Sequence, residues 1–415
     1  MIRSTLALAL IASNVAMADN IAIINAKAVT QSAQGTLENA TILIRGDEIV
    51  AIGNGVNIPA GTAVIDAAGQ YVTPGLVGTA VNWGSVEVSA ESSTVDAYSD
   101  ESGAATSMQY AINPDSTRLP LAYRFGFTRA VVAPGGGSKV FLGQAAAIKT
   151  YGDDIVTAAD IAQFVDVEEF GKDVSGGTRA ALWVNLERVM ADAKHYANNP
   201  RDRYSNAGSY VLSLDSLEAL QAVISGDVPL VFDANRMSDL RLVMDFAERH
   251  NLKAVIRGGA EAWRVADELA AADIAVLVDP YLNLPYGFDQ RAARLDNAAL
   301  LNAAGVTIAF YNGEPYTGQT LTQAAGLAVA HGLPWESAVD ALTVNPVDIF
   351  GGAYSATMEI GQTADVVIWS GDPLELTSAP TTVIIDGEQV DLTTREEALA
   401  KRYFDINQAE PFSYN

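Results

Sequence analysis

The middle of the chain repeats one pattern, in which a short apolar run is followed by a segment with helical spacing. Helical segments lie near 238–249, 261–271 and 321–330, and the apolar runs lie at 228–233, 253–256, 274–278 and 306–310. Strands that are apolar on both faces are typical of parallel sheets covered by helices. Alternation with a repeat of roughly 20–30 residues indicates βαβ units. The middle of the chain is therefore predicted to be an α/β domain with a parallel sheet.

Both ends of the chain differ from this middle because they predict short strands without helices between them. The expected strands lie at 21–25, 40–45, 49–52, 63–66 and 71–72, and again at 363–369 and 382–386. Gly, Asn, Asp and Pro stand between them, as turns require. Two β-rich ends around a large insert predict one β domain built from both termini.

Charge and composition exclude several classes of protein. Lys and Arg number 25 against 50 Asp and Glu, a formal net charge of -25. A general nucleic-acid binder needs a basic surface, and anionic lipid attracts basic segments, so neither partner is expected. The chain has no cysteine, which excludes disulfides, thiolate nucleophiles and Cys-ligated zinc. The three histidines, His195, His250 and His331, fall in or at the ends of predicted helices, where a histidine needs no function.

The N-terminus has the three parts of a secretory signal peptide. Arg3 precedes an apolar run at 6–12, and Ala16-Met17-Ala18 forms an A-x-A cleavage site. The run is shorter than the ~20 residues that a membrane-spanning helix needs. We therefore predict that residues 1–18 are removed and that the protein is periplasmic or secreted. The alternative interpretation is a buried N-terminal helix.

Five short segments resemble the metal-dependent amidohydrolases, with the imidazolonepropionase-like branch as the nearest. TPGLV at 73–77 resembles the passage from a β-sandwich into a barrel. NP at 345–346 and GQTADVV at 361–367 resemble the return into the sandwich, and GDPL at 371–374 and IDG at 385–387 complete the pattern. These motifs are spread over nearly the whole chain after the signal peptide.

The resemblance implies a fold and an activity. The fold is a (β/α)8 TIM-like barrel with a small β-sandwich domain built from both chain ends. The implied boundaries are 19–73 and 353–400 for the sandwich, 74–352 for the barrel and 401–415 for a C-terminal tail. The implied activity is hydrolysis of carbon–nitrogen bonds other than peptide bonds, by a water that zinc or another divalent metal activates.

The positions that match the family's metal ligands do not carry ligands here. The H-x-H motif of the family matches Ala80 and Asn82, and its later histidines match Asp233 and fall near Arg257. The closing aspartate of the family falls near Asn312. Alanine cannot bind a metal, a neutral amide oxygen is a poor zinc ligand, and a guanidinium repels cations. We therefore expect no metal cofactor, and a binding pocket lined by these five residues.

Asp233 is the remaining charged candidate for catalysis. Its carboxylate suits a general base, a ligand for a hard ion, or a partner for Arg257. The alternatives are a helix cap or a structural salt bridge near a strand end. In a barrel, residues at the carboxyl ends of strands usually form the site, which is why we treat Asp233 as a candidate catalytic residue.

Three loops are further candidates around the barrel mouth. The glycine-rich run 134–139 suits an anion cradle or a flexible loop without the Walker spacing. The acidic, serine-rich run 85–103 suits calcium or a solvated loop over the mouth. The aromatic run 281–288 is expected either to line the mouth or to pack against the rim.

These observations predict that the protein is an amidohydrolase homologue with a degenerate metal site, and therefore a candidate pseudoenzyme. Such a protein would bind a small molecule, or pair with a catalytic homologue or with a second copy of itself. An active hydrolase with a metal-independent or shifted site is the other interpretation.

The export prediction has a direct test. Removal of residues 1–18 leaves Asp19 as the first residue, so N-terminal sequencing of the exported protein should begin Asp-Asn-Ile-Ala. Recovery of the full-length chain from the cytosol alone would contradict the prediction.

Overall fold

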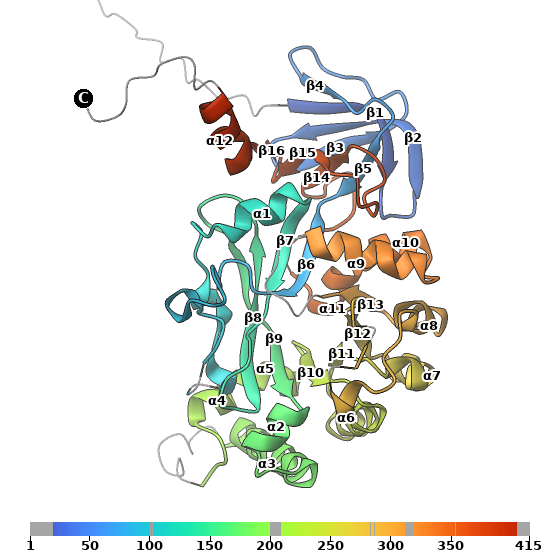
Figure 1. Cartoon of the computed structure of the whole chain (residues 1–415). Helices are drawn as coiled ribbons and strands as arrows, with labels where there is room; N and C mark the ends of the chain where they lie inside the picture. The colour runs from blue at the N-terminus through green and yellow to red at the C-terminus, as the bar shows by residue number, and fades with distance from the viewer. Residues whose placement is uncertain are drawn as a thin grey trace, which may run out of the picture.

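A computed structural model describes residues 20–99, 101, 103–199, 209–282, 284–285, 287–311, 319–352 and 354–404 (Figure 1). The predicted signal peptide, the candidate Asn312 and the end of the predicted tail lie outside these residues. None of the described helices is long and apolar enough to cross a membrane.

The first sheet is built from both ends of the chain. Its strands are β1 (Asn20–Val29), β2 (Thr36–Arg45), β3 (Glu48–Gly53), β4 (Ala63–Asp66), β5 (Tyr71–Pro74), β14 (Val366–Trp369), β15 (Pro380–Ile385) and β16 (Glu388–Gln389). They pair in the order β16-β15-β14-β5-β1-β2-β3, with β4 beside β1. Strands from the two ends of the chain therefore lie side by side, because β5 pairs with β14, at the top of Figure 1. This sheet shows that both termini share one structure; the two-layered sandwich and the domain boundaries stay predictions.

The second sheet is a nearly closed barrel. Its strands follow the chain in order: β6 (Leu76–Val81), β7 (Phe127–Val132), β8 (Phe141–Lys149), β9 (Val156–Asp166), β10 (Leu230–Ala234), β11 (Ala254–Gly258), β12 (Ala275–Val278) and β13 (Ile308–Phe310). One buried apolar cluster takes residues from each of these strands, which fills the interior as in other eight-stranded barrels. The mixed α/β chain with an eight-stranded barrel is thus confirmed.

The barrel departs from the regular (β/α)8 pattern at β8. This strand is antiparallel to both β7 and β9, and no helix is described between β7 and β9. Only residues 150–155 join β8 to β9, too few for the crossover that a parallel pair needs. The expectation of eight alternating units is therefore wrong in this part of the barrel. From β9 onwards, the neighbouring strands are parallel.

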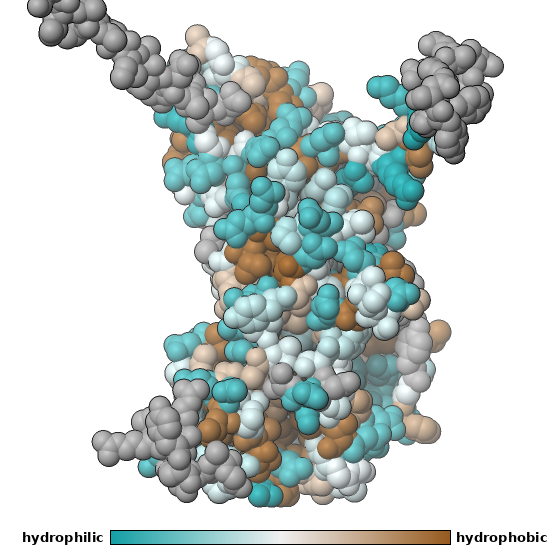
Figure 2. Space-filling view, turned by 90° about the vertical axis from the view of Figure 1, so that its left-hand side faces the viewer, coloured by the Kyte–Doolittle hydropathy of each residue, from teal (hydrophilic) through white to brown (hydrophobic). Residues whose placement is uncertain are grey.

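Most helices cover the barrel on the outside, whereas the last helix, α12, lies beside the first sheet (Figure 1). Their bounds are α1 (Arg118–Arg124), α2 (Glu169–Val174), α3 (Arg179–Asn198), α4 (Leu214–Ala219), α5 (Gln221–Ser225), α6 (Met237–His250), α7 (Ala266–Ala271), α8 (Asn297–Ala303), α9 (Gln319–Ala330), α10 (Trp335–Asp340), α11 (Val344–Phe350) and α12 (Arg395–Phe404). Short 3₁₀ turns include η1 (Ser92–Thr94), η2 (Gly103–Ala105), η3 (Met108–Ala111), η5 (Ala262–Val265) and η6 (Phe288–Gln290). The face shown in Figure 2 is mostly hydrophilic, with apolar residues in separate patches.

A buried ion-pair network joins the barrel to the first sheet. Arg129 on β7 is 4% exposed, and its Nε donates to Asp365 at 2.6 Å. The same guanidinium also donates to Asp386, which Lys149 on β8 approaches at 3.2 Å. The two aspartates lie just before β14 and just after β15, so segments far apart in sequence meet at one guanidinium. Burial lowers the pKa of Arg129, but Asp365 and Asp386 more than offset this and raise it.

Arg129→Ala should strongly destabilise the protein, because it leaves Asp365 and Asp386, between the barrel and the first sheet, without their main cation. Removal of one partner from a buried pair costs about 3–5 kcal/mol of the free energy of unfolding. Urea unfolding of the variant and the wild type measures the difference. The matched control is Arg241→Ala, which removes an exposed guanidinium paired with Glu268 and should have little effect. Equal stability of the two variants would show that the network does not hold the sheets together.

Candidate functional site

Charged side chains lie in register at the carboxyl ends of three neighbouring strands. Asp233 on β10 pairs in register with Asp166 on β9 and with Arg257 on β11. Two residues earlier on the same strands stand the interior apolar residues Phe164, Val231 and Val255. Strand side chains alternate between faces, so all three charged residues project on the interior side of the barrel. The parallel register therefore creates a charged layer above an apolar one.

Asp233 and Arg257 form a two-pronged ion pair. The Nε and Nη2 atoms of Arg257 donate to the two carboxylate oxygens of Asp233, each at 2.6 Å. The guanidinium carbon also lies 4.8 Å from the centre of the Phe164 ring, within the range of a cation–π contact. Burial lowers the pKa of Arg257, but the Asp233 carboxylate more than offsets this and raises it, so the guanidinium stays charged.

A cavity of about 290 Å³ opens at this layer. Its lining includes four of the five residues that the sequence proposed, namely Ala80, Asn82, Asp233 and Arg257. The structure thus brings these four together, while Asn312 lies outside the described residues. We call this space the mouth cavity. It is slightly below the roughly 300–1,000 Å³ of typical small-molecule pockets. The role of the four residues stays a prediction.

The backbone at Ala80 is strained. Its φ angle is +52°, in the left-handed region that non-glycine residues seldom adopt. The pairing of β6 with β7 shifts register between Gly78 and Val81, so a bulge surrounds this residue. Bulges and left-handed residues are frequent beside binding sites, where they redirect side chains. The end of β6 keeps this site-like geometry although Ala80 has no ligating atom.

Glu168 and Asn235 line the same cavity, and sequence reasoning missed both. Asn235 is 6% exposed, and its Oδ1 accepts the backbone N–H of Ala260 at 2.9 Å. This contact directs the amide nitrogen to Oε1 of Glu168, to which it donates. The second carboxyl oxygen of Glu168 makes no hydrogen bond to the residues that the structure describes.

The carboxyl groups of this wall are pushed towards their neutral forms. Burial, followed by the charges of Asp233 and Asp166, raises the pKa of Glu168 to about 8. Burial and Asp233 raise the pKa of Asp166 to about 6. Arg257 is already paired with Asp233, and Glu168 makes no ion pair with a Lys, Arg or His among the described residues. Glu168 is therefore mainly a neutral acid near pH 7, which can donate a hydrogen bond.

Asp166 also organises the turn that carries Glu168. Its Oδ1 accepts the backbone N–H of Glu168 at 2.7 Å and that of Gly171 at 3.3 Å. A Cβ atom on Gly171 would lie 1.9 Å from the backbone oxygen of Asp166, so only glycine permits this close approach. The turn therefore places Glu168 beside the cavity.

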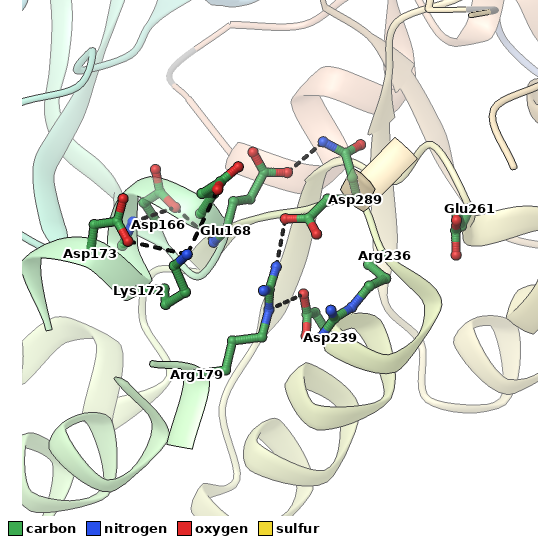
Figure 3. Close-up of polar contacts among 12 residues, drawn as sticks. Asp166, Glu168, Lys172, Asp173, Arg179, Arg236, Asp239, Glu261 and Asp289 are labelled. Atoms are coloured by element: carbon green, nitrogen blue, oxygen red, sulfur yellow. Dashed lines mark hydrogen bonds and ion pairs between the residues drawn. The ribbon is translucent and has the colours of Figure 1, made fainter. Parts of the chain in front are cut away.

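Figure 3 shows how the neighbouring loops are tied together. Arg179, the first residue of α3, donates to Asp239 in the first turn of α6 at 2.9 Å. It also donates to Asp289 in η6, so one guanidinium joins three segments. Of the loops proposed from sequence, the glycine-rich loop lines the mouth cavity through Gly135 and Gly136. Tyr98 lines the cavity from the acidic loop, whereas no described residue of 281–288 does.

The donor set does not fit the divalent metal of the amidohydrolases. Ala80 offers a methyl group, both oxygens of Asp233 are bonded to Arg257, and Arg257 itself is cationic. Among the residues that the structure describes, no group of three or more His, Asp or Glu side chains is arranged to hold a metal ion. His195 and His250 lie on α3 and α6, His331 follows α9, and none of the three lines the mouth cavity.

Comparison with curated proteins finds a partial match to an amidohydrolase. No protein-family model matches the chain. A stretch of 179 residues is 25% identical to amidohydrolase tasK of Hapsidospora irregularis. This stretch covers 41% of this chain and only 18% of that protein.

Solved structures match over nearly the whole chain. An amidohydrolase from Thermotoga maritima MSB8 has a TM-score of 0.80 at 22% identity, over 89% of this chain and 99% of that one. A triazine hydrolase from Arthobacter aurescens has a TM-score of 0.54 at 16% identity, over 92% of this chain and 98% of that one. The chain therefore has the fold of the amidohydrolases, as its motifs suggested. The imidazolonepropionase-like branch is not singled out.

The raised pKa of Glu168 predicts a specific dependence of stability on pH. The pKa rises from 4.5 to about 8 on folding, so between these values the folded chain binds one more proton than the unfolded chain. The resulting stabilisation is fully present below the pKa of the unfolded chain, 4.5, and is lost as the pH rises to the pKa of the folded chain, about 8. The free energy of unfolding should fall with rising pH by up to about 1.4 kcal/mol per pH unit from this group.

Glu168→Gln removes this group and retains an oxygen that can accept from Asn235. Urea unfolding from about pH 5 to about pH 8 should therefore give a shallower slope for the variant than for the wild type. Asp166, whose pKa is also raised, contributes to the slope of both proteins and cancels in the comparison. Identical slopes would show that Glu168 is ionised throughout.

Proposed function

We propose that this protein binds a small amide-containing molecule in the mouth cavity without a metal ion. The observation that carries the proposal is the Arg257–Asp233 pair, because it occupies with a fixed cation the positions where the family resemblance places metal ligands. The amidohydrolase fold suggests the class of ligand, a molecule with a carbon–nitrogen bond of the kind that such enzymes cleave. The fold alone does not establish activity.

The polar groups of the cavity suit such a ligand. A neutral Glu168 donates to a carbonyl oxygen, and the backbone and side chain around Asn235 fix its orientation. Tyr311 is also in the lining, and burial raises the pKa of its hydroxyl, which keeps it protonated and able to donate. An amide carbonyl oxygen can accept hydrogen bonds from the carboxyl group of Glu168 and the hydroxyl group of Tyr311, whereas a cationic ligand would be repelled by Arg257.

Metal-independent hydrolysis is the second candidate, and one observation favours it. Glu168 is a neutral acid, while Asp233 lines the same cavity with its carboxylate bonded to Arg257. Two carboxyl groups with different protonation states can act as general acid and general base. In this chain, the strong ion pair competes with any proton transfer to Asp233, which is why we place binding first.

The test combines ligand binding, chelation and product analysis. Calorimetric titration of purified protein with cyclic amides and N-acyl amino acids should show saturable binding to at least one class, unchanged by EDTA. Asp233→Ala leaves Arg257 unpaired, so it should lower the free energy of unfolding by about 3–5 kcal/mol and alter the ligand preference. The control Asp245→Ala removes an exposed carboxylate of α6 and should change neither the free energy of unfolding nor the ligand preference.

Three outcomes separate the interpretations. Binding without product, in EDTA, supports the proposal. Product formation in EDTA supports metal-independent hydrolysis instead. Stoichiometric zinc in the purified protein, or loss of binding on chelation, would contradict both, because it would mean that a metal site exists in another place.

Location and partners belong to the same proposal. We infer export to the periplasm or secretion from residues 1–18, and pairing with a catalytic homologue or a second copy as the alternative to independent binding. The face in Figure 2 offers no dominant apolar patch of the kind that stable interfaces bury.

A further inference from the structure

A second cavity lies at the carboxyl-end side of the barrel, and we call it the rim cavity. It measures about 640 Å³ and lies between the first turn of α6, the turn η5 and the residues around η6. Its lining includes Arg236, Arg264 and Arg291 together with Glu261 and Phe288. It shares no lining residue with the mouth cavity, although Asn235 of the mouth directly precedes Arg236 of the rim.

The charge of the rim cavity is opposite to that of the chain. Three guanidinium groups and one carboxylate line it, in a protein with a formal charge of -25. The mouth cavity has two carboxyl groups and one guanidinium. The cavity at the amino-end side of the barrel, lined by Asp227, Lys253, Asp273 and Asp348, is acidic as well. Of these three cavities, only the rim cavity has an excess of cations.

The one carboxylate in the rim cavity is already satisfied by the fold. Glu261 is 4% exposed, and its oxygens accept the backbone N–H groups of Met237 at 3.1 Å and Ala292 at 3.2 Å. Arg264 approaches the same carboxylate at 3.3 Å. Glu261 therefore joins the two walls of the cavity, and its charge is spread over three donors. It makes no ion pair with Arg236 or Arg291 among the described residues.

Two of the three arginines keep donors for a ligand. Arg236 uses Nη2 for Asp239 at 2.9 Å, and its side chain is 36% exposed, so other N–H groups of the guanidinium stay open to a ligand. Asp239 also receives a bond from Arg179, so its charge is shared (Figure 3). Arg291 is exposed and makes no ion pair with the part of the chain that the structure describes. Such N–H groups bind an acceptor, and the oxygens of an anion suit a guanidinium best.

The remaining walls indicate what accompanies this acceptor. The 14-residue helix α6 begins at the cavity, and its N-terminal end adds a positive partial charge. Phe288 is 85% exposed at the cavity wall, so its ring is available to pack against an apolar part of a ligand. An oxyanion beside a flat apolar body would satisfy both features.

We propose that the rim cavity binds the carboxylate or phosphate group of a small organic acid, with Arg236, Arg264 and Arg291 as its cationic contacts and Phe288 as an apolar one. Guanidinium groups suit both oxyanions because their paired N–H groups match two oxygens at once. The site is independent of the mouth cavity and of the function proposed for it.

The test uses three anions and two matched double variants. Inorganic phosphate, phenyl phosphate and benzoate are titrated into the full chain by calorimetry at fixed ionic strength. Phenyl phosphate should bind more tightly than inorganic phosphate because its ring can cover Phe288. Arg264→Gln/Arg291→Gln should weaken binding by about tenfold or more, since it removes two of the three cationic contacts. The control Arg188→Gln/Arg241→Gln makes the same change of charge at exposed positions of α3 and α6 outside the cavity.

Phe288→Ser separates the two parts of the proposed site. This variant should bind phosphate as the wild type does, but should lose the preference for phenyl phosphate. A carboxylate ligand is indicated if benzoate binds more tightly than phenyl phosphate, and a phosphate ligand if the order is reversed. The proposal is overturned if none of the three anions shows saturable binding, or if the control weakens binding as much as the cavity variant. Urea unfolding of each variant confirms that it is folded.

Discussion

The ion pair between Asp233 and Arg257 determines the chemistry of the mouth cavity. A charge inside a barrel is costly unless it is paired, and these two side chains satisfy each other through two hydrogen bonds. Burial, followed by the charges of Asp233 and Asp166, raises the pKa of Glu168 to about 8. The pair thus places a fixed cation and a bonded carboxylate beside Glu168, whose neutral form is a hydrogen-bond donor.

The two cavities consequently suit different ligands although they lie on the same side of the barrel. The mouth cavity combines a neutral acid with a closed ion pair and suits an uncharged polar group. The rim cavity has more guanidinium groups than carboxylates and suits an anion. Asn235 and Arg236, adjacent in sequence, belong to the two cavities respectively, because successive residues after a strand point in different directions.

Sequence patterns predicted much of the fold and part of the site, for identifiable reasons. The strands β10 to β13 are apolar up to their carboxyl ends, and these ends could be placed well enough to bring Asp233 and Arg257 together. The strands β8 and β9 were missed because their sequences, such as Gln144-Ala145-Ala146-Ala147, are rich in alanine, a good helix former. Tertiary pairing overrides that preference. Glu168 was missed because it follows β9, and its raised pKa depends on neighbours from other strands.

An arginine projects into the barrel interior at each end. Arg129 and Val131 lie two residues apart on β7, and Val131 belongs to the interior cluster, so Arg129 projects inward at the amino end. Arg257 does so at the carboxyl end. At the amino end, the guanidinium bonds aspartates of the other sheet and holds the two sheets together. At the carboxyl end, the partner belongs to the barrel itself and the pair borders a cavity. This division follows the rule for barrels that the amino-end face stabilises and the carboxyl-end face binds. The same residue type therefore joins the two sheets at one end and borders the mouth cavity at the other.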